Sequence, residues 1–175
     1  MAELTTACVQ GGGYGSIEGA SGTLSLSTNW LCVTDWTSAW TAGSKRGSDR
    51  VLPGLDGVIA FRRRLAAATF DLPFIVIGGY LWSGAAATDL DSARAYLAQN
   101  IAHLFDEVFP NPATPDGQRL MSISTPGGAL NRTAYVHVLG VDVGERAEGF
   151  DIKDGAPQAA SLGTLTFSIA DGVFV

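Results

Sequence analysis

Few side chains in this sequence are of types that carry out catalysis, and their spacing matches no common catalytic or metal-binding pattern. The two histidines are His103 and His137. They take no part in an HxH or HExxH spacing, and the chain has no CxxC, so a zinc site is not predicted. There is no G-x-S-x-G turn to expose a serine nucleophile. We therefore expect no catalytic residues, no cofactor, no metal and no enzymatic activity.

The region 141–160 is acidic, and oxygen-rich segments of this kind sometimes bind calcium. Its carboxylates are Asp142, Glu145, Glu148, Asp151 and Asp154. Their spacing differs from the ligand positions of an EF-hand loop. The sequence favours a solvated, irregular loop over a calcium site.

Three tryptophans lie close together at Trp30, Trp36 and Trp40. Each has a large apolar area to bury and an indole N–H that needs an acceptor. We interpret them as core residues or as anchors at a subunit interface. The alternative is an aromatic platform that binds a carbohydrate.

A basic triplet, Arg62, Arg63 and Arg64, follows an apolar run. One interpretation is a solvated strand end. The functional one is a set of interface residues that pair with carboxylates of a neighbouring subunit. Contact with nucleic acid is disfavoured, because the chain carries a net charge of −6 and has no second basic cluster.

The one clear helix is predicted over residues 88–109. Leu97, Ile101, Leu104 and Val108 repeat at helical spacing and form an apolar stripe. Thr88 is the predicted N-cap, with Asp91 as its capping-box partner. Such a stripe requires a sheet to pack against.

The remaining apolar runs favour β-strands. Two strands are predicted within 23–40, with others near 58–61, 74–77, 120–123, 131–139 and 165–169. In the run 131–139, Tyr135, His137 and Leu139 share one face, opposite Ala134 and Val136. The predicted fold class is mainly β (α+β): an antiparallel β-sandwich with one packed α-helix. We expect a Gly-rich arm at 1–22 and a single domain at 23–175.

Composition points to a protein whose surface is partly covered by other subunits. Only 16% of the 175 residues are charged, which is low for a monomer, and 22 are glycine. No apolar run is long enough to span a membrane. The two cysteines, Cys8 and Cys32, cannot form a disulfide framework, and a buried thiol at Cys32 is favoured over a bridge between them.

Residues 48–109 resemble a known family. The matching elements are Asp49-Arg50-Val51-Leu52-Pro53-Gly54 with Gly57, the arginines at 62–64, the run Asp71-Leu72-Pro73-Phe74-Ile75-Val76-Ile77-Gly78, and the helix centre Leu97-Ala98-Gln99-Asn100-Ile101-Ala102-His103-Leu104. This segment is similar to the core of siphophage distal tail proteins and of small minor tail proteins of actinobacteriophages.

The resemblance implies a virion structural protein. Members of this family form a hexameric ring at the distal end of a non-contractile tail, where the ring joins the tail tube to the tip hub. DNA passes through the lumen without tight binding. The alternatives are a tail tube or tail terminator protein of the same module, or a carbohydrate-binding β-sandwich. The long second domain of many distal tail proteins has no counterpart in this sequence.

Overall fold

The centre of the molecule is one curled antiparallel sheet. The structure is a computed structural model and describes residues 14–41, 44–46, 50–51, 58–59, 64–66, 68–109, 118–125, 128–151 and 157–169. Seven strands lie side by side in the order β2-β1-β9-β10-β11-β8-β3. Their bounds are β1 Tyr14–Glu18, β2 Thr23–Ser25, β3 Leu31–Val33, β8 Ala68–Ile77, β9 Gln118–Ser124, β10 Asn131–Asp151 and β11 Pro157–Ile169.

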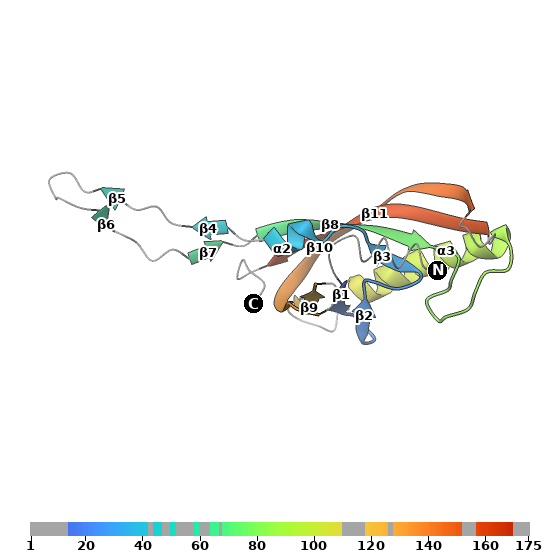
Figure 1. Cartoon of the computed structure of the whole chain (residues 1–175), viewed down its shortest axis with the longest axis horizontal. Helices are drawn as coiled ribbons and strands as arrows, with labels where there is room; N and C mark the ends of the chain where they lie inside the picture. The colour runs from blue at the N-terminus through green and yellow to red at the C-terminus, as the bar shows by residue number, and fades with distance from the viewer. Residues whose placement is uncertain are drawn as a thin grey trace.

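Helix α3, Leu90–Val108, lies in the concave side of the sheet, which curls around it as a half-barrel (Figure 1). The mainly β fold with a packed helix is therefore confirmed, with one curled sheet in place of the two sheets of a sandwich. A short helix, α2, spans Thr37–Thr41, where the sequence predicted the end of a strand. Asp35 accepts a hydrogen bond from the backbone N–H of Thr37 at 2.8 Å, and this turn starts the helix.

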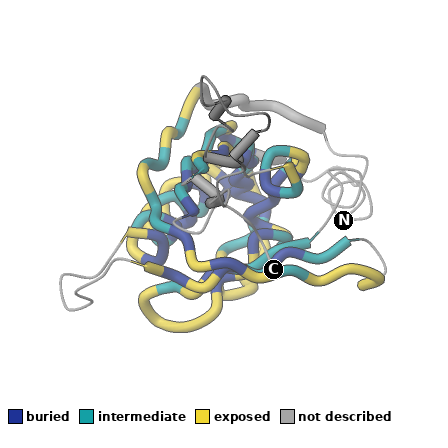
Figure 2. Tube along the Cα trace, turned by 90° about the vertical axis from the view of Figure 1, so that its left-hand side faces the viewer, coloured by how far each residue is buried: buried dark blue, intermediate teal, exposed yellow. Residues whose placement is uncertain are grey.

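The hydrophobic core fills the space between α3 and the sheet. The alternating residues of β8, Phe70, Leu72, Phe74 and Val76, point inward and are buried. On the helix, Leu97, Leu104 and Val108 are buried, as the apolar stripe predicted. Figure 2 shows the buried residues gathered in the middle of the trace. The burial of this stripe, rather than intrinsic helix propensity, fixes the position of α3.

The first turn of α3 is capped one residue later than the sequence predicted. Asp89 is the N-cap and accepts from the N–H of Ser92 at 2.7 Å, while the Ser92 hydroxyl lies 3.1 Å from the N–H of Asp89. The predicted pair of Thr88 and Asp91 is therefore wrong by one position, because serine replaces the usual glutamate in the reciprocal contact. None of the helices in the described parts of the chain is long and apolar enough to cross a membrane.

Strand β10 is much longer than predicted. It pairs with β9 over residues 131–137 and with β11 over residues 136–151. The register shifts between Val138 and Gly140, between Val143 and Arg146, and between Glu148 and Phe150, so the β10–β11 hairpin is bulged. The predicted acidic loop at 141–160 is wrong: Asp142 and Asp151 lie on β10, and β11 begins at Pro157.

Part of the predicted N-terminal arm belongs to the sheet. Residues 14–18 form β1, which pairs with β2 and β9, and Ile17 is fully buried. Residues 1–13 lie outside the described residues. Cys32, buried in β3, is disulfide-bonded rather than the free thiol that the sequence favoured. The only other cysteine of the chain, Cys8, lies outside the described residues.

Two small ladders stand apart from the sheet. Strand β4, Ser44–Arg46, pairs with β7, Arg64–Ala66, and strand β5, Arg50–Val51, pairs with β6, Val58–Ile59. Figure 1 shows both ladders in line beyond the N-terminal end of β8, away from α3. They belong to neither face of the seven-stranded sheet.

Candidate interaction surface

The convex face of β1, β9 and β10, directed away from α3, is the outer face. It carries Leu120 and Tyr135 in direct cross-strand register, and the carboxylate of Glu18 lies 3.4 Å from the backbone N–H of Leu120. Tyr135 is 59% exposed and Leu139, further along β10, is 55% exposed. Ala134 and Val136, on either side of Tyr135, are buried, so the predicted division of this strand into two faces is confirmed. Large apolar side chains on a solvent-facing strand are typical of a contact surface.

Next to this row, the outer face becomes rich in hydroxyl groups. Ser25, Ser16, Ser122 and Thr133 form a second register row across four strands. Tyr14, Ser124 and Asn131 form a third row. Residues of these two rows line a depression of about 390 Å³, together with Gly15, Ile123 and Arg132. Arg132 is the only charged residue in this lining.

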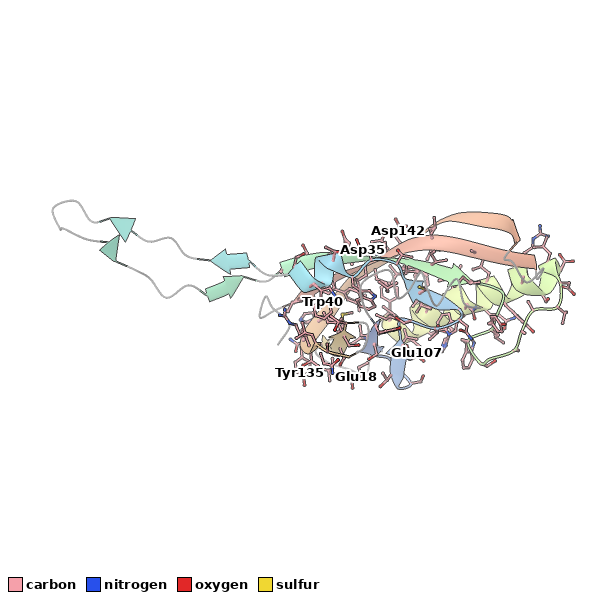
Figure 3. All side chains as sticks on the ribbon, viewed as in Figure 1. Glu18, Asp35, Trp40, Glu107, Tyr135 and Asp142 are labelled. Atoms are coloured by element: carbon pink, nitrogen blue, oxygen red, sulfur yellow. The ribbon has the colours of Figure 1, made fainter. Side chains whose placement is uncertain are left out.

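Arg132 is held by an aromatic ring. Its guanidinium carbon lies 5.8 Å from the centroid of Trp40, within the range of a cation–π interaction. Trp40 is half-buried against the core at the end of α2. Figure 3 labels Trp40, Glu18 and Tyr135 near one another, on the side of the sheet from which the two ladders extend. Arg132 pairs with the buried Ile123 and alternates with Thr133, so its side chain lies on the core side of the sheet, opposite the hydroxyl groups of the outer face.

Two buried charged residues fasten the β1–β2 hairpin to α3. Glu107, 6% exposed, accepts from the Ser21 N–H at 3.0 Å and from the Ser21 hydroxyl. Arg119, 7% exposed, donates to the carbonyls of Glu18 at 2.6 Å and Phe109 at 2.7 Å. The contact with Phe109 places a positive charge at the negative end of the helix. Together they fix the outer face relative to the core.

The same contacts set the ionisation of Glu107. Burial alone raises the pKa of this carboxyl, because it disfavours the charged form. The hydrogen bonds from Ser21 and Ala20 and the nearby His103 outweigh burial, so the pKa lies below its ordinary value of 4.5. Glu107 is therefore a buried carboxylate satisfied by hydrogen bonds. Its geometry is that of a structural clamp, because it lies between two packed elements.

A third polar clamp involves Asn100, which is fully buried on α3. It donates to the carbonyls of Ile77 at 2.8 Å and Tyr80 at 2.7 Å, and accepts from the N–H of Trp82 at 2.9 Å. The Trp82 ring stacks on His103 with centroids 4.2 Å apart, and His103 packs on Trp30 at 5.6 Å. Trp82 is 49% exposed.

Sequence reasoning missed this cluster. The only sequence signal is an asparagine within the apolar half of a helix, which needs partners when it is buried.

The three tryptophans, interpreted from the sequence as core residues or interface anchors, lie at different depths. Trp36 is fully buried against Gly15, where a Cβ would overlap the indole ring, and Trp30 is 6% exposed. Both therefore act as core residues of this chain. Trp40 is the one that borders the surface.

The structure places one residue of the basic triplet and both histidines. Arg62 and Arg63 lie outside the described residues, and the backbone of Arg64 pairs with that of Arg46 in the β4–β7 ladder. His103 lies on α3, whereas His137 lies on β10, 3.3 Å from Gln118. Among the residues that the structure describes, no three metal-ligating side chains come together.

Comparisons with known proteins give a match only among solved structures. No family model matches, and no curated protein matches. The structure of the phage P2 baseplate in its activated conformation with Ca is similar, with 9% identity and a TM-score of 0.48 over 90% of this chain and 44% of that chain. The same baseplate with Sr has 10% identity and a TM-score of 0.48, again over 90% and 44%.

A further match is the crystal structure of the SPP1 Dit (gp 19.1) protein, described as a paradigm of the hub adsorption apparatus in phages that infect Gram-positive hosts. Its identity is 17% and its TM-score 0.41, over 90% of this chain and 50% of that chain. The chain thus spans about half the length of these solved chains.

Proposed function

We propose that this protein is a structural subunit of a phage tail, and that it forms a hexameric ring at the distal end that connects the tail tube to the tip hub. The position in the particle comes from the resemblance of residues 48–109 to distal tail proteins. The fold supports the second part of the proposal, the assembly of identical subunits into a ring. A ring of identical subunits requires each copy to offer a surface and an element that reaches it.

The observation that carries the proposal is the placement of the β4–β7 and β5–β6 ladders. They lie in line beyond the N-terminal end of β8, away from the sheet and from α3 (Figure 1). A two-stranded ladder without a packed face is marginal in water. A second copy of the chain is the partner that is always present at the right stoichiometry, so we assign the ladders to a contact between neighbouring subunits.

The surface that we assign to receive the ladders consists of Leu120, Tyr135 and Leu139, which we call the apolar row of the outer face. Leu120, Tyr135 and Leu139 are all exposed and lie on adjacent strands. Exposed aromatic and aliphatic side chains with few nearby charges are the usual centre of a protein interface. This choice also agrees with a low charged fraction of 16%.

The test is the mass of the assembly in solution. Light scattering and native mass spectrometry of the full chain should give six subunits. A variant in which residues 44–66 are replaced by a Gly-Ser segment of equal length should be monomeric, with an unchanged circular dichroism spectrum. Tyr135→Arg should weaken the assembly, whereas Ala98→Arg, at an exposed site on α3, is the matched control. A monomeric full chain would overturn the proposal, and a hexameric ladder variant would overturn the role of the ladders.

The location in the particle needs a separate experiment. Immunogold labelling of phage particles should place the protein at the distal tail end. Labels along the whole tail would instead identify a tube protein, and labels at the head-proximal end a terminator. Because the lumen is proposed to let DNA pass, the chain should show no submicromolar affinity for duplex DNA at physiological salt.

The carbohydrate platform formed by the three tryptophans is not part of this proposal. Trp30 and Trp36 are buried and present no ring face to a sugar. Any glycan contact therefore has to use other residues.

A further inference from the structure

We propose that the exposed ring of Trp82 is a stacking platform for a neutral sugar of the gluco configuration, namely a β-linked glucose or N-acetylglucosamine unit. This goes beyond the ring-forming role and does not rest on it. Trp82 belongs to the loop between β8 and α3, which lies at the end of the molecule opposite the two ladders (Figure 1). It is 49% exposed, and in this fully described loop it is the only large apolar residue with an exposed side chain.

The first argument is that the fold holds this ring in one orientation. The backbone N–H of Trp82 donates to the buried side chain of Asn100 at 2.9 Å. The same amide donates to the carbonyls of Ile77 and Tyr80, so it fixes the loop to α3. One face of the indole is stacked on His103, with the centroids 4.2 Å apart and an interplanar angle of 20°. A ring fixed in this way loses little conformational freedom when a ligand stacks on it.

The base of the platform is also fixed. His103 packs against the buried Trp30, with ring centroids 5.6 Å apart. In the loop, the N–H of Leu81 donates to the carbonyl of Ala85 at 2.8 Å, which closes a turn around Trp82. The indole therefore presents a flat face at a rigid position instead of a side chain that can turn into a partner's pocket.

The second argument is the chemistry of that face. In a gluco-configured pyranose every ring substituent is equatorial, so each face of the sugar ring exposes C–H groups alone. These hydrogens carry a small positive charge, and the face of an aromatic ring is negative because of its quadrupole. A sugar that stacks on the indole keeps its hydroxyls at the rim, where water or neighbouring polar side chains can bind them.

The surroundings of the ring are small or polar. The residues that follow it in the loop are exposed and leave room for a ligand: Ser83, Gly84, Ala85 and Ala86. On α3, Gln99 lies four residues before His103 and Asp106 three residues after it, so both are on the same side of the helix. Both are exposed, and within the part of the chain that the structure describes neither makes a hydrogen bond or an ion pair.

These two side chains also set the charge of the ligand. The amide of Gln99 both donates and accepts, and the carboxylate of Asp106 accepts from hydroxyl groups. With Asp106 beside the platform and a net charge of −6 on the chain, an anionic sugar is disfavoured.

A protein partner fits this location less well, because protein interfaces need a continuous apolar patch. The other large apolar residues exposed in the described part of the chain belong to neither this loop nor the body of α3: Phe109, Leu120, Leu130, Tyr135, Leu139 and Leu162. Trp82 is thus a single aromatic ring among small and polar residues.

The test uses three trisaccharides with β-1,4 linkages: cellotriose, chitotriose and the triglucuronate that corresponds to cellotriose. Saturation-transfer NMR detects weak ligands, and the full chain is used in whatever oligomeric state it has in solution. We expect cellotriose or chitotriose to bind, with the strongest transfer at the ring C–H groups that face the indole. The triglucuronate should bind at least about ten-fold more weakly, because its carboxylates meet Asp106.

Variants locate the site. Trp82→Ala should weaken the neutral probes by at least about ten-fold, and Trp82→Phe should retain part of the binding because an aromatic face remains. Both variants keep the backbone N–H that binds Asn100, so the circular dichroism spectrum should not change. Asp106→Asn should reduce the discrimination against the triglucuronate. Leu162→Ala, which removes a similarly exposed apolar side chain from β11, is the matched control and should bind as wild type does.

Two results would overturn the proposal: absence of saturation transfer for both neutral probes, or equal sugar binding by wild type and Trp82→Ala. A Trp82→Ala variant with lower assembly mass and unchanged sugar binding would identify the ring as a subunit contact instead. Sugar binding by a monomeric full chain would support the platform while the ring proposal failed, so the two proposals are tested separately.

Discussion

At the scale of single residues, buried polar groups hold the fold in place. Asn100 connects α3 to the segment after β8 through three hydrogen bonds. Glu107 and Arg119 connect the same helix to β1 and to the turn after it. Each of these side chains is buried, so removing one leaves its hydrogen-bond partners unsatisfied away from the surface.

For Asn100 this leads to a specific prediction. Asn100→Leu keeps a similar size but removes all three hydrogen bonds, and it should destabilise the protein by about 2–4 kcal/mol. Urea unfolding measures the change. Gln99→Ala, at the exposed neighbouring position, should cost less than about 0.5 kcal/mol. If both variants lose the same stability, the hydrogen bonds of Asn100 are not the cause.

Glu107 predicts a dependence of stability on pH. Its pKa in the folded protein lies below 4.5, so the ionised carboxylate is favoured by folding. This contribution is fully present above the unfolded value and is lost as the pH falls through the folded value. The stability difference between the wild type and Glu107→Gln should therefore shrink as the pH falls from 7 towards 3.

Urea unfolding at constant protein concentration checks this dependence. Ser21→Ala removes the hydroxyl that donates to Glu107, so it should reduce the same pH dependence in part. Parallel curves for the wild type and Glu107→Gln would contradict the assignment.

At the scale of elements, α3 and the sheet stabilise each other. Leu104 is fully buried in the centre of the helix, whereas Ile101 is only partly buried at its edge. Leu104→Ala should lower the free energy of unfolding by about 2–5 kcal/mol, because it leaves a cavity between α3 and the sheet. Ile101→Ala should cost clearly less. A Leu104→Ala variant as stable as wild type would show that the helix does not depend on this packing.

The elements also show which parts of the fold local sequence patterns can predict. The strand predicted at 165–169 and the apolar stripe of α3 rest on strong periodic signals, and both were correct. The strand predicted at 74–77 is the end of β8, which begins earlier, at Ala68. The second half of β10 was missed because its acidic residues hide the pattern, and because three register shifts interrupt the regular alternation along the β10–β11 hairpin. The cap of α3 was misplaced by one residue because Thr88 and Asp89 are both good caps.

The candidate site was harder to predict than the fold. The outward direction of Tyr135 and Leu139 followed from simple alternation. The depression did not, because Ser16, Ser122 and Thr133 come from three separated segments and become neighbours only through strand register. Isolated serines carry no sequence signal of their own. The burial of Trp36 likewise depends on a glycine in another strand, Gly15.

At the scale of the whole molecule, net charge acts on any assembly of identical copies. Each chain carries −6, so a ring of six carries six times −6, or −36. Exposed charges interact over about 10 Å at 0.1 M salt, and their repulsion weakens as salt is added. The apolar row of the outer face, in contrast, is little affected by moderate salt.

These two facts predict the direction of the salt effect on assembly. Raising NaCl from about 20 mM to about 200 mM should lower the protein concentration at which the ring dissociates, because screening reduces repulsion between subunits. Light scattering over a dilution series measures this concentration. Potassium glutamate at matched ionic strength controls for chloride binding. A ring that dissociates more readily with added salt would show that attraction between opposite charges dominates the interface, with Arg62, Arg63 and Arg64 as the first residues to replace by glutamine.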